Sequence, residues 1–398
     1  MTAAENAHDF PDRQRLEVVI VEDLDPSSPK MGGVAGYSRK LLKYLEKADI
    51  KSTLLGSGNG HSHPHKGKSA YIPIIRKPKF TGYEYLLRLL TKAPFLRIPG
   101  SAIIHAQHPE YMLPFVLFNR SNPKVVAIRG PVLKEIRFKR GRLVSYIYGK
   151  VEPFILKRSD IVLTVDEATR KFYLREYPWM ENIRLIPTGV DLSKFKLLDR
   201  ESLRRRYGFG PEDNIVIYVG RLEKEKGVDF LLEAFSLVEK SVPSSRLVIV
   251  GDGKERQALE ELAIVTGLRG VVFMGSLGPD AVPEILNTAD VLALSSVYEG
   301  SPTVVKEALA CGVPVVSADV GDVRQIIRSE AVGMIVERDR LTYAQALVNY
   351  VSLADRETVR KVCAEAAAEF SFDNIGARTV ALYGELACRE KTGKRALL

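Results

Sequence analysis

Short runs of β-branched and apolar residues alternate with amphipathic helical segments along the whole chain. The runs are apolar at nearly every position, which predicts strands buried on both faces, as in parallel sheets covered by helices. The expected strands are residues 16–22, 102–106, 124–128 and 160–165 in the first half and 214–219, 246–250, 271–274, 291–295 and 313–317 in the second. The pattern therefore predicts an α/β fold.

The strands and helices of this 398-residue chain form two series, each long enough for its own doubly wound sheet. Pro, Gly, Asp and Ser interrupt the pattern at residues 187–196 and indicate a connection there. No strand follows the last helix, which must therefore dock elsewhere, and we expect it to return to the first domain. The expected divisions are a flexible tail over residues 1–15, a first domain over 16–192, a second over 193–372 and a final helix over 373–398.

Ligands of open parallel sheets bind beyond the carboxyl ends of the strands, so binding motifs should follow strands. Residues 299–322, EGSPTVVKEALACGVPVVSADVGD, follow an expected strand and open a helix. Ser301 suits the N-cap and Pro302 the first helical position. The next amides, of Thr303 and Val304, would then point off the helix end and form a seat for a phosphate.

Two carboxylates and two cations add to this phosphate seat. Glu299 and Glu307 are eight residues apart, which brings them near one azimuth of a helix, where they suit hydrogen bonds to a sugar on each side of a diphosphate. Arg221 and Lys226 lie at the turn of a strand–loop–helix segment, residues 218–235, and are suitable cations for a diphosphate. The alternative is an ordinary capped helix with surface glutamates.

Glycine-rich turns follow two further strands. Residues 247–254, LVIVGDGK, end a strand in such a turn but lack the spacing of a dinucleotide site. Near the N-terminus, Gly32 and Gly33 precede an amphipathic helix and would let backbone amides approach a ligand closely. Each turn taken singly is weak evidence.

Together these segments resemble the GT-B glycosyltransferases, and specifically glycosyltransferase family 4, the retaining group. The resemblance covers almost the whole chain and is strongest from 186 to 327. Its motifs are the Gly-Gly loop, IPTGVD at 186–191, the GR…KG turn at 220–227, VGDG at 250–253, and the E-x7-E spacing with EGSP and GVPVV. It implies two Rossmann-like domains facing across a cleft, with a C-terminal helix that crosses back to the N-terminal domain.

The resemblance also implies a nucleotide-diphosphate sugar held mainly by the second domain. Glu307 should hold the ribose and Glu299 the donor sugar, while Arg221 and Lys226 should neutralise the diphosphate as bond breaking proceeds. Backbone amides at the starts of two helices should complete the phosphate cradle. The residues concerned are Gly32 and Gly33 in the first domain and Gly300, Ser301, Pro302, Thr303 and Val304 in the second. The base should lie near Gly251, Phe273 and Leu277. No metal or other cofactor is expected.

Two positions depart from the family pattern. Many members carry a His-x-His pattern at the end of an N-terminal strand, but here His105 is followed by Gln107, with His108 next to it. His105 is therefore either an active-site residue or a structural histidine. Thr188 stands in IPTGVD where the family more often has Asn.

The positive charge of the chain is concentrated in its first half. Residues 1–190 hold 31 basic and 18 acidic side chains, whereas residues 191–398 hold 27 and 31. Segments 76–97 and 134–158 mix Arg and Lys with Tyr, Leu and Phe, which is typical of an element at an anionic membrane surface. The alternatives are a packed helix with solvated charges and a nucleic-acid surface, although no recognised nucleic-acid motif accompanies the charge.

No run of 18 apolar residues occurs, and the N-terminus lacks the apolar region of a signal peptide, so we expect a cytoplasmic protein, peripheral on the inner face of the cell membrane. The three cysteines are far apart, and the alternating histidines of the loop at 61–65 have no Cys or carboxylate nearby, so neither set predicts a metal site.

The predicted function is transfer of a sugar from a nucleotide diphosphate to a hydroxyl of a glycan or lipid-linked saccharide, in cell-surface polysaccharide or glycolipid synthesis. A GT-B epimerase or phosphorylase and a catalytically dead membrane-surface protein are the alternatives.

Overall fold

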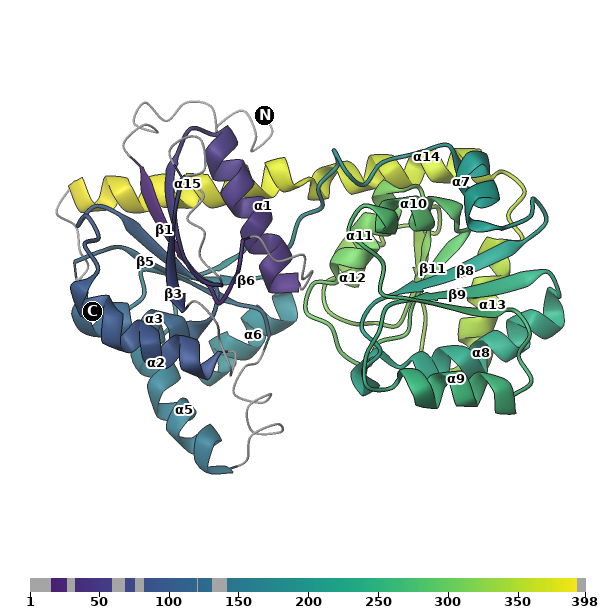
Figure 1. The fold of residues 1–398 in the computed structure, drawn as a ribbon, viewed down its shortest axis with the longest axis horizontal. Helices are drawn as coiled ribbons and strands as arrows, with labels where there is room; N and C mark the ends of the chain where they lie inside the picture. The colour runs from purple at the N-terminus through teal and green to yellow at the C-terminus, as the bar shows by residue number, and fades with distance from the viewer. Residues whose placement is uncertain are drawn as a thin grey trace. The chain divides into compact units, whose positions relative to one another are not determined.

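The computed structural model describes residues 16–26, 33–58, 69–75, 82–119, 121–130 and 142–391. Contacts between residues divide the chain into two compact units (Figure 1). The first comprises Met1–Pro187 and Phe372–Leu398, and the second comprises Thr188–Ser371. The divisions therefore fall after residues 187 and 371, where the sequence predicts them after 192 and 372.

The first unit contains a parallel seven-stranded sheet in the order β3-β2-β1-β4-β5-β6-β7. Its strands are β1 (Glu17–Val21), β2 (Lys51–Ser57), β3 (Ser69–Ile75), β4 (Ile103–Ala106), β5 (Lys124–Ile128), β6 (Ile161–Thr164) and β7 (Ile183–Leu185). The strands β4, β5 and β6 are buried at every position, as their apolar sequences predict.

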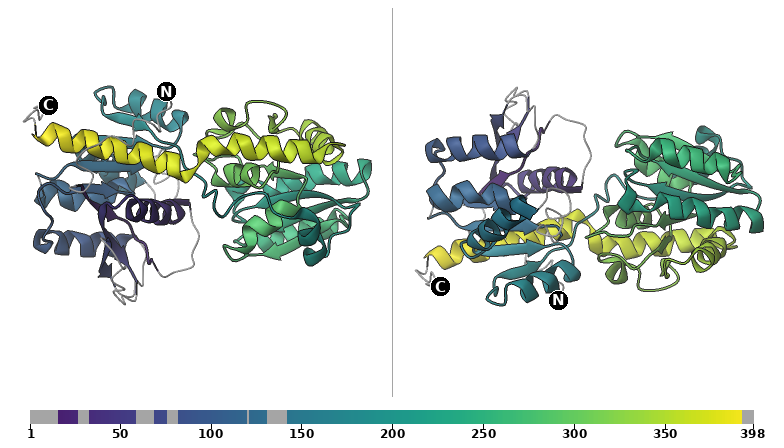
Figure 2. Two further views of the ribbon diagram at one scale, coloured as in Figure 1. Left: turned by 90° about the horizontal axis from the view of Figure 1, so that it is seen from above. Right: turned by 90° about the horizontal axis from the view of Figure 1, so that it is seen from below.

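Helices cover both faces of this sheet (Figures 1 and 2). One apolar core lies under α1 (Gly33–Lys47) and α15 (Phe372–Lys391), and the other lies under α2 (Tyr83–Lys92), α3 (Pro109–Phe118), α5 (Arg142–Leu156) and α6 (Glu167–Glu176). The rings of Tyr37 and Phe372 meet edge to face with centroids 5.6 Å apart. The C-terminal helix thus packs on the first unit, as predicted.

The second unit has a parallel six-stranded sheet in the order β10-β9-β8-β11-β12-β13. The strands are β8 (Asn214–Val219), β9 (Ser245–Val250), β10 (Val271–Gly275), β11 (Val291–Leu294), β12 (Val315–Ser317) and β13 (Gly333–Ile335). One face carries α10 (Ala281–Thr288), α11 (Thr303–Ala310), α12 (Val323–Ile326) and α14 (Arg356–Ala367), and the other carries α8 (Val228–Ser241), α9 (Arg256–Val265) and α13 (Arg340–Val351).

Both sheets are doubly wound. The first three strands of each sheet are added toward one edge, and the fourth strand is placed on the other side of the first, so that the later strands extend toward the opposite edge. That switch point lies between β1 and β4 in the first unit and between β8 and β11 in the second. Ligands bind beyond the carboxyl ends of the strands at such a point. The loops after these strands, at the carboxyl edge of each sheet, are therefore the candidate ligand sites.

Candidate active site

At the carboxyl edge of the second sheet, an ion pair joins the loops that follow β8 and β11. The Lys226 Nζ lies 2.6 Å from Glu299 Oε1, and the Ser296 hydroxyl donates to the same oxygen at 2.7 Å. Both charged side chains are largely buried, with 17% and 15% of their surface exposed. The structure thus brings together two residues that the sequence predicts as partners in one site.

Glycine permits this close approach. Lys226 ends the short 3₁₀ helix η4 (Lys224–Lys226), and Gly227 follows with φ of 62°. A Cβ at Gly227 would lie 2.5 Å from the Ser295 carbonyl oxygen, so a side chain would push η4 away from the end of β11. The Ser295 hydroxyl in turn donates to the Lys226 carbonyl at 3.0 Å.

The helix expected to seat a phosphate starts later than predicted. Helix α11 begins at Thr303, its N-cap is Pro302, and no side chain caps it, so the prediction of Ser301 as N-cap and Pro302 as first helical residue is wrong. The Pro302 backbone is extended, with ψ of 107°, which places it before the first helical turn. The amides of Thr303 and Val304 still lie in the first turn, where N–H groups have no acceptor within the helix.

Ser301 is instead part of a buried polar cluster that we call the Lys306 network, made of Thr188, Ser301, Lys306 and Asp322. The Lys306 Nζ donates to Asp322 Oδ2 at 3.0 Å, to the Ser301 hydroxyl at 2.7 Å and to the Thr188 hydroxyl at 3.1 Å. Ser301 also donates to Asp322 at 2.6 Å. The Lys306 and Asp322 side chains are 0% and 1% exposed. The network therefore anchors the segment before α11 to the interior.

Sequence reasoning missed Lys306 and Asp322. The available signal was a lysine inside the apolar helix TVVKEALA, because lysine is almost never fully buried unless it is paired. The network also gives Thr188 a defined role in this chain, since its hydroxyl contacts both Lys306 and Ser301.

The remaining predicted donor-site residues lie around the same edge. Glu307 is half-buried in α11, and Arg221 is exposed just after β8. Gly251 follows β9 with φ of 139°, and a Cβ there would lie 1.8 Å from the Gly220 carbonyl oxygen, so only glycine fits between these loops. Phe273 and Leu277, expected near the base, are half-buried in and after β10. Gly300 is half-buried beside Glu299.

His105 is buried and engaged on both ring nitrogens. Its Nδ1 lies 2.6 Å from the Tyr383 hydroxyl of α15, and the Gln107 amide lies 3.2 Å from its Nε2. Burial, and then the charge of Arg129, lower the pKa of His105 to about 3, so the ring is neutral. These contacts favour the structural alternative for His105, a link between β4 and the C-terminal helix. Arg129 donates to the Gln107 side-chain oxygen at 2.6 Å.

At the switch point of the first unit, sequence reasoning missed Glu22. This residue follows β1, is 5% exposed, and has a buried Oε2 with no hydrogen-bond partner. Burial raises the pKa of Glu22 to about 8, and the nearby positive charge of Arg129 opposes the shift. The buried Nε of Arg129 also has no partner. A carboxyl oxygen of Glu22 and a guanidinium N–H of Arg129, both buried and without a hydrogen-bond partner, therefore lie at this edge.

The glycines expected to face the donor are only partly described. Gly33 is the exposed first residue of α1, and Gly32 lies outside the described residues, as do the histidines of the loop at 61–65. Among the described residues, no group of three His, Cys, Asp or Glu side chains is placed to hold a metal ion. Cys311, Cys363 and Cys388 are free thiols.

Two family models match the two units of the chain. The model described as Glycosyltransferase Family 4 matches residues 31–194, and the model described as Glycosyl transferases group 1 matches residues 199–370. The chain belongs to glycosyltransferase family 4. Family membership thus confirms the resemblance inferred from the E-x7-E spacing and the glycine turns.

Curated relatives of this family 4 chain match it over part of their length. An uncharacterised glycosyltransferase of Methanocaldococcus jannaschii is 31% identical over 240 residues, which are 56% of this chain and 59% of the relative. A D-inositol 3-phosphate glycosyltransferase of Rhodococcus opacus is 34% identical over 179 residues, 43% of this chain and 40% of that protein. The chain spans about half the length of the curated relatives it matches.

Solved structures resemble this family 4 chain over nearly all of its length. The sucrose-phosphate synthase of Thermosynechococcus elongatus has a TM-score of 0.77 at 24% identity, over 94% of this chain and 100% of that one. The HepE protein of Anabaena, solved with UDP-glucose, has a TM-score of 0.71 at 17% identity, over 93% and 99%. These likenesses, with the two doubly wound sheets, confirm the predicted GT-B fold.

Proposed function

We propose that this chain is a retaining glycosyltransferase that moves a sugar from a nucleotide-diphosphate sugar to an acceptor hydroxyl. The observation that carries the proposal is the Lys226–Glu299 pair beside the start of α11, at the switch point of the second sheet. A cation, a carboxylate and unpaired helix amides suit a sugar attached to a diphosphate. The complex of HepE with UDP-glucose is a precedent for such a donor in this fold.

In the proposed reaction, the donor diphosphate lies against the first-turn amides of α11, with Arg221 and Lys226 beside it. Negative charge grows on the leaving diphosphate as the glycosidic bond breaks, and the two cations stabilise it. Glu299 binds hydroxyls of the donor sugar and Glu307 those of the ribose. The acceptor hydroxyl attacks from the face that the diphosphate leaves, and a phosphate oxygen takes its proton.

The donor assignment is tested with a panel of UDP-, GDP- and ADP-sugars, measured by thermal unfolding and calorimetry. We expect one nucleotide to raise the unfolding temperature, because a ligand that binds only the folded state stabilises it. Glu307→Gln should weaken that binding about 10- to 100-fold through loss of charged hydrogen bonds to the ribose. The control is Glu337→Gln, an exposed glutamate. Equal affinity in wild type and Glu307→Gln contradicts the assignment.

We further propose that the acceptor is lipid-linked and that the first unit binds an anionic membrane surface on the cytoplasmic side. Helix α5 presents Leu143, Tyr146 and Ile147 to solvent, with 73%, 67% and 55% of their surface exposed, and these positions share one helix face. Lys150 extends the same face. Apolar and basic residues on one exposed face suit a helix that lies in the membrane interface.

Other exposed apolar residues of the first unit lie on and just after α2. Tyr83 and Leu87 on α2 are 50% and 64% exposed, and Phe95 after it is 84% exposed. Helices α2 and α5 cover the same face of the first sheet. The basic residues 134–141 lie outside the described residues. In the part of the chain that is described, no helix combines the length and the hydropathy needed to span a bilayer.

Vesicle co-sedimentation tests this surface. The double variant Tyr146→Glu/Ile147→Glu should bind anionic phosphatidylglycerol vesicles at least about 10-fold more weakly, because two apolar side chains can no longer enter the interface. The matched control is Ile264→Glu/Val265→Glu, which changes two apolar residues of the second unit that are 77% and 84% exposed. Unchanged partitioning of the α5 variant, or an equal loss in the control, contradicts membrane binding through α5.

A further inference from the structure

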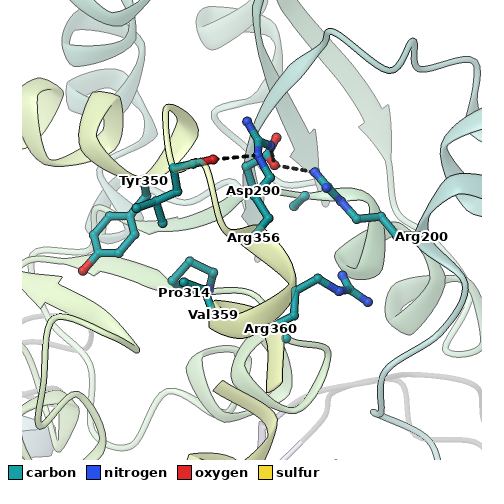
Figure 3. A pocket seen from close by; sticks show the side chains of 10 residues that line it. Arg200, Asp290, Pro314, Tyr350, Arg356, Val359 and Arg360 are labelled. Atoms are coloured by element: carbon teal, nitrogen blue, oxygen red, sulfur yellow. Dashed lines mark hydrogen bonds and ion pairs between the residues drawn. The ribbon is translucent and has the colours of Figure 1, made fainter. Parts of the chain in front are cut away.

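Four arginines converge at the amino edge of the second sheet, opposite to the edge that carries the donor-site residues. Arg200 and Arg204 belong to α7 (Arg200–Tyr207), and Arg356 and Arg360 belong to the first two turns of α14. Arg200, Arg356 and Arg360 line a pocket together with Asp290, which immediately precedes β11 (Figure 3), and Arg204 pairs with the same carboxylate. We call these four residues the arginine cluster.

Asp290 is the one buried carboxylate among these four guanidinium groups. Its side chain is 1% exposed and pairs with Arg200, Arg204 and Arg356, and it also accepts the Ile215 backbone N–H at 2.7 Å. The four arginine side chains are themselves 7% to 29% exposed. Three guanidinium groups therefore share a single buried carboxylate, and the fourth, that of Arg360, donates to Asn287 and Leu198 instead.

The other carboxylates at this surface are exposed and have their own partners. Asp199 caps α7 by accepting the Ser202 N–H at 3.2 Å. Glu201 is 87% exposed and pairs with Arg205 of the same helix. Glu357 is 68% exposed and lies 3.6 Å from Lys361 and 3.9 Å from Arg360. All three carboxylates line the same pocket as Arg200, Arg356 and Arg360. Because water and salt screen exposed charges, they offset the buried positive charge only in part.

The cluster still has hydrogen-bond donors to offer. Arg204 donates to the carbonyls of Thr288 and Asp213 as well as to Asp290. Arg356 and Arg360 also have protein acceptors, which are Leu353, Asn214 and Val351 for Arg356 and Asn287 and Leu198 for Arg360. The Nε of Arg200, in contrast, is buried without a partner. Burial, and then the charges of Arg200 and Arg204, lower the pKa of Arg356 to about 10, which leaves it charged at pH 7 but shows the repulsion that an anion would relieve.

A pocket of suitable size opens at this place. Two adjoining pockets share Arg200, Arg356 and Arg360; the inner one is backed by Asp290, and the outer one has a volume of about 370 Å³. Pockets for small ligands range from about 300 to 1,000 Å³. Forked guanidinium groups bind phosphate oxygens in pairs, and a dianion matches the excess of positive charge better than a carboxylate does.

We propose that the arginine cluster is a second ligand site of this protein, which binds a small phosphomonoester with its phosphate against Arg200, Arg356 and Arg360. The site is independent of the proposed transferase activity, because its residues lie at the amino edge of the sheet and none of them belongs to the donor site. The ligand is a soluble phosphate compound of about the size of glycerol 3-phosphate.

The test is thermal unfolding and calorimetry of the whole chain with inorganic phosphate and with glycerol 3-phosphate, each compared with potassium chloride at equal ionic strength. We expect both phosphates to raise the unfolding temperature more than chloride does. Arg200→Gln should weaken the binding at least 10-fold, since it removes the unpartnered donor while Arg204, Arg356 and Ile215 still hold Asp290. Arg200→Lys should give an intermediate loss.

Two controls locate the site. Arg205→Gln changes an arginine of the same helix that is 70% exposed, and it should bind phosphate like the wild type. Lys226→Met alters the donor site and should also leave phosphate binding intact. Tighter binding of glycerol 3-phosphate than of phosphate supports an esterified ligand, and equal binding supports free phosphate. A shift no larger than that with chloride, an unchanged affinity in Arg200→Gln, or a loss in Lys226→Met alone overturns the proposal.

Discussion

Replacing Lys226 by methionine is expected to lower kcat for donor hydrolysis about 100- to 1,000-fold, the usual effect of removing one group that stabilises charge in a transition state. The Lys226 Nζ is held 2.6 Å from Glu299 and is largely buried, so it acts in a place where water screens its charge poorly. Slow hydrolysis of the nucleotide sugar found in the panel supplies the assay, without knowledge of the acceptor. KM should change less than kcat, because the charge on the diphosphate grows mainly in the transition state.

The control for this variant lies two residues away. Lys224 belongs to the same 3₁₀ helix but is 76% exposed and pairs with Asp229. Lys224→Met should keep kcat within about twofold of the wild type, because exposed ion pairs contribute little. If Lys224→Met and Lys226→Met lose activity equally, the effect comes from the fold of η4 and the proposed role of Lys226 is wrong.

Replacing Lys306 by methionine is expected to lower the free energy of unfolding by about 3–5 kcal/mol, because the buried Asp322 then loses its cation. Asp322 already has one oxygen, Oδ1, without a partner, so nothing within the network replaces the lost charge. Urea denaturation measures the loss. The double variant Lys306→Met/Asp322→Leu should recover most of it, since an apolar pair of similar volume leaves no buried charge unpaired.

The matched control is Lys361→Met, on α14 of the same unit, where the side chain is 63% exposed. Its effect should stay within about 0.5 kcal/mol. A loss below about 1 kcal/mol in Lys306→Met contradicts the assignment of Lys306 and Asp322 as a buried pair that stabilises the fold.

The sequence predicted five of the six strands of the second sheet, including β10 at its edge, but missed β13 and, in the first sheet, β2, β3 and β7. The inner strand β2 was missed because its sequence, KSTLLGS, is mostly polar although most of its positions are buried. The strands β4, β5 and β6 are buried at every position, and each has a mostly apolar sequence. In β3 the burial alternates along most of the strand, and it lies at the edge of its sheet, while β7 and β13 have three residues each. Short or half-exposed strands carry too little apolar patterning to be recognised from sequence.

In the candidate donor site, too, the sequence predicted some features correctly and missed others. The sequence predicted Lys226 and Glu299 in one site because both residues belong to motifs that follow strands, and parallel strands end at one edge. Their direct ion pair was not predicted. The start of α11 was predicted one residue too early, because Ser301 is a good N-cap by type but its hydroxyl is taken by Asp322 and Lys306. A local preference was overridden by a contact with a residue 21 positions away.

The sequence by itself determined the fold class, the family and the segments that form the candidate donor site, because apolar periodicity and strand-end motifs are local properties of the chain. Only the tertiary structure decided which buried polar side chains contact one another. Thr188 meets Ser301 across 113 residues, and Arg204 meets Asp290 across 86. Such pairs depend on how separate βα units pack, and the cost of burying a charge without a partner then selects the arrangement in which these groups meet.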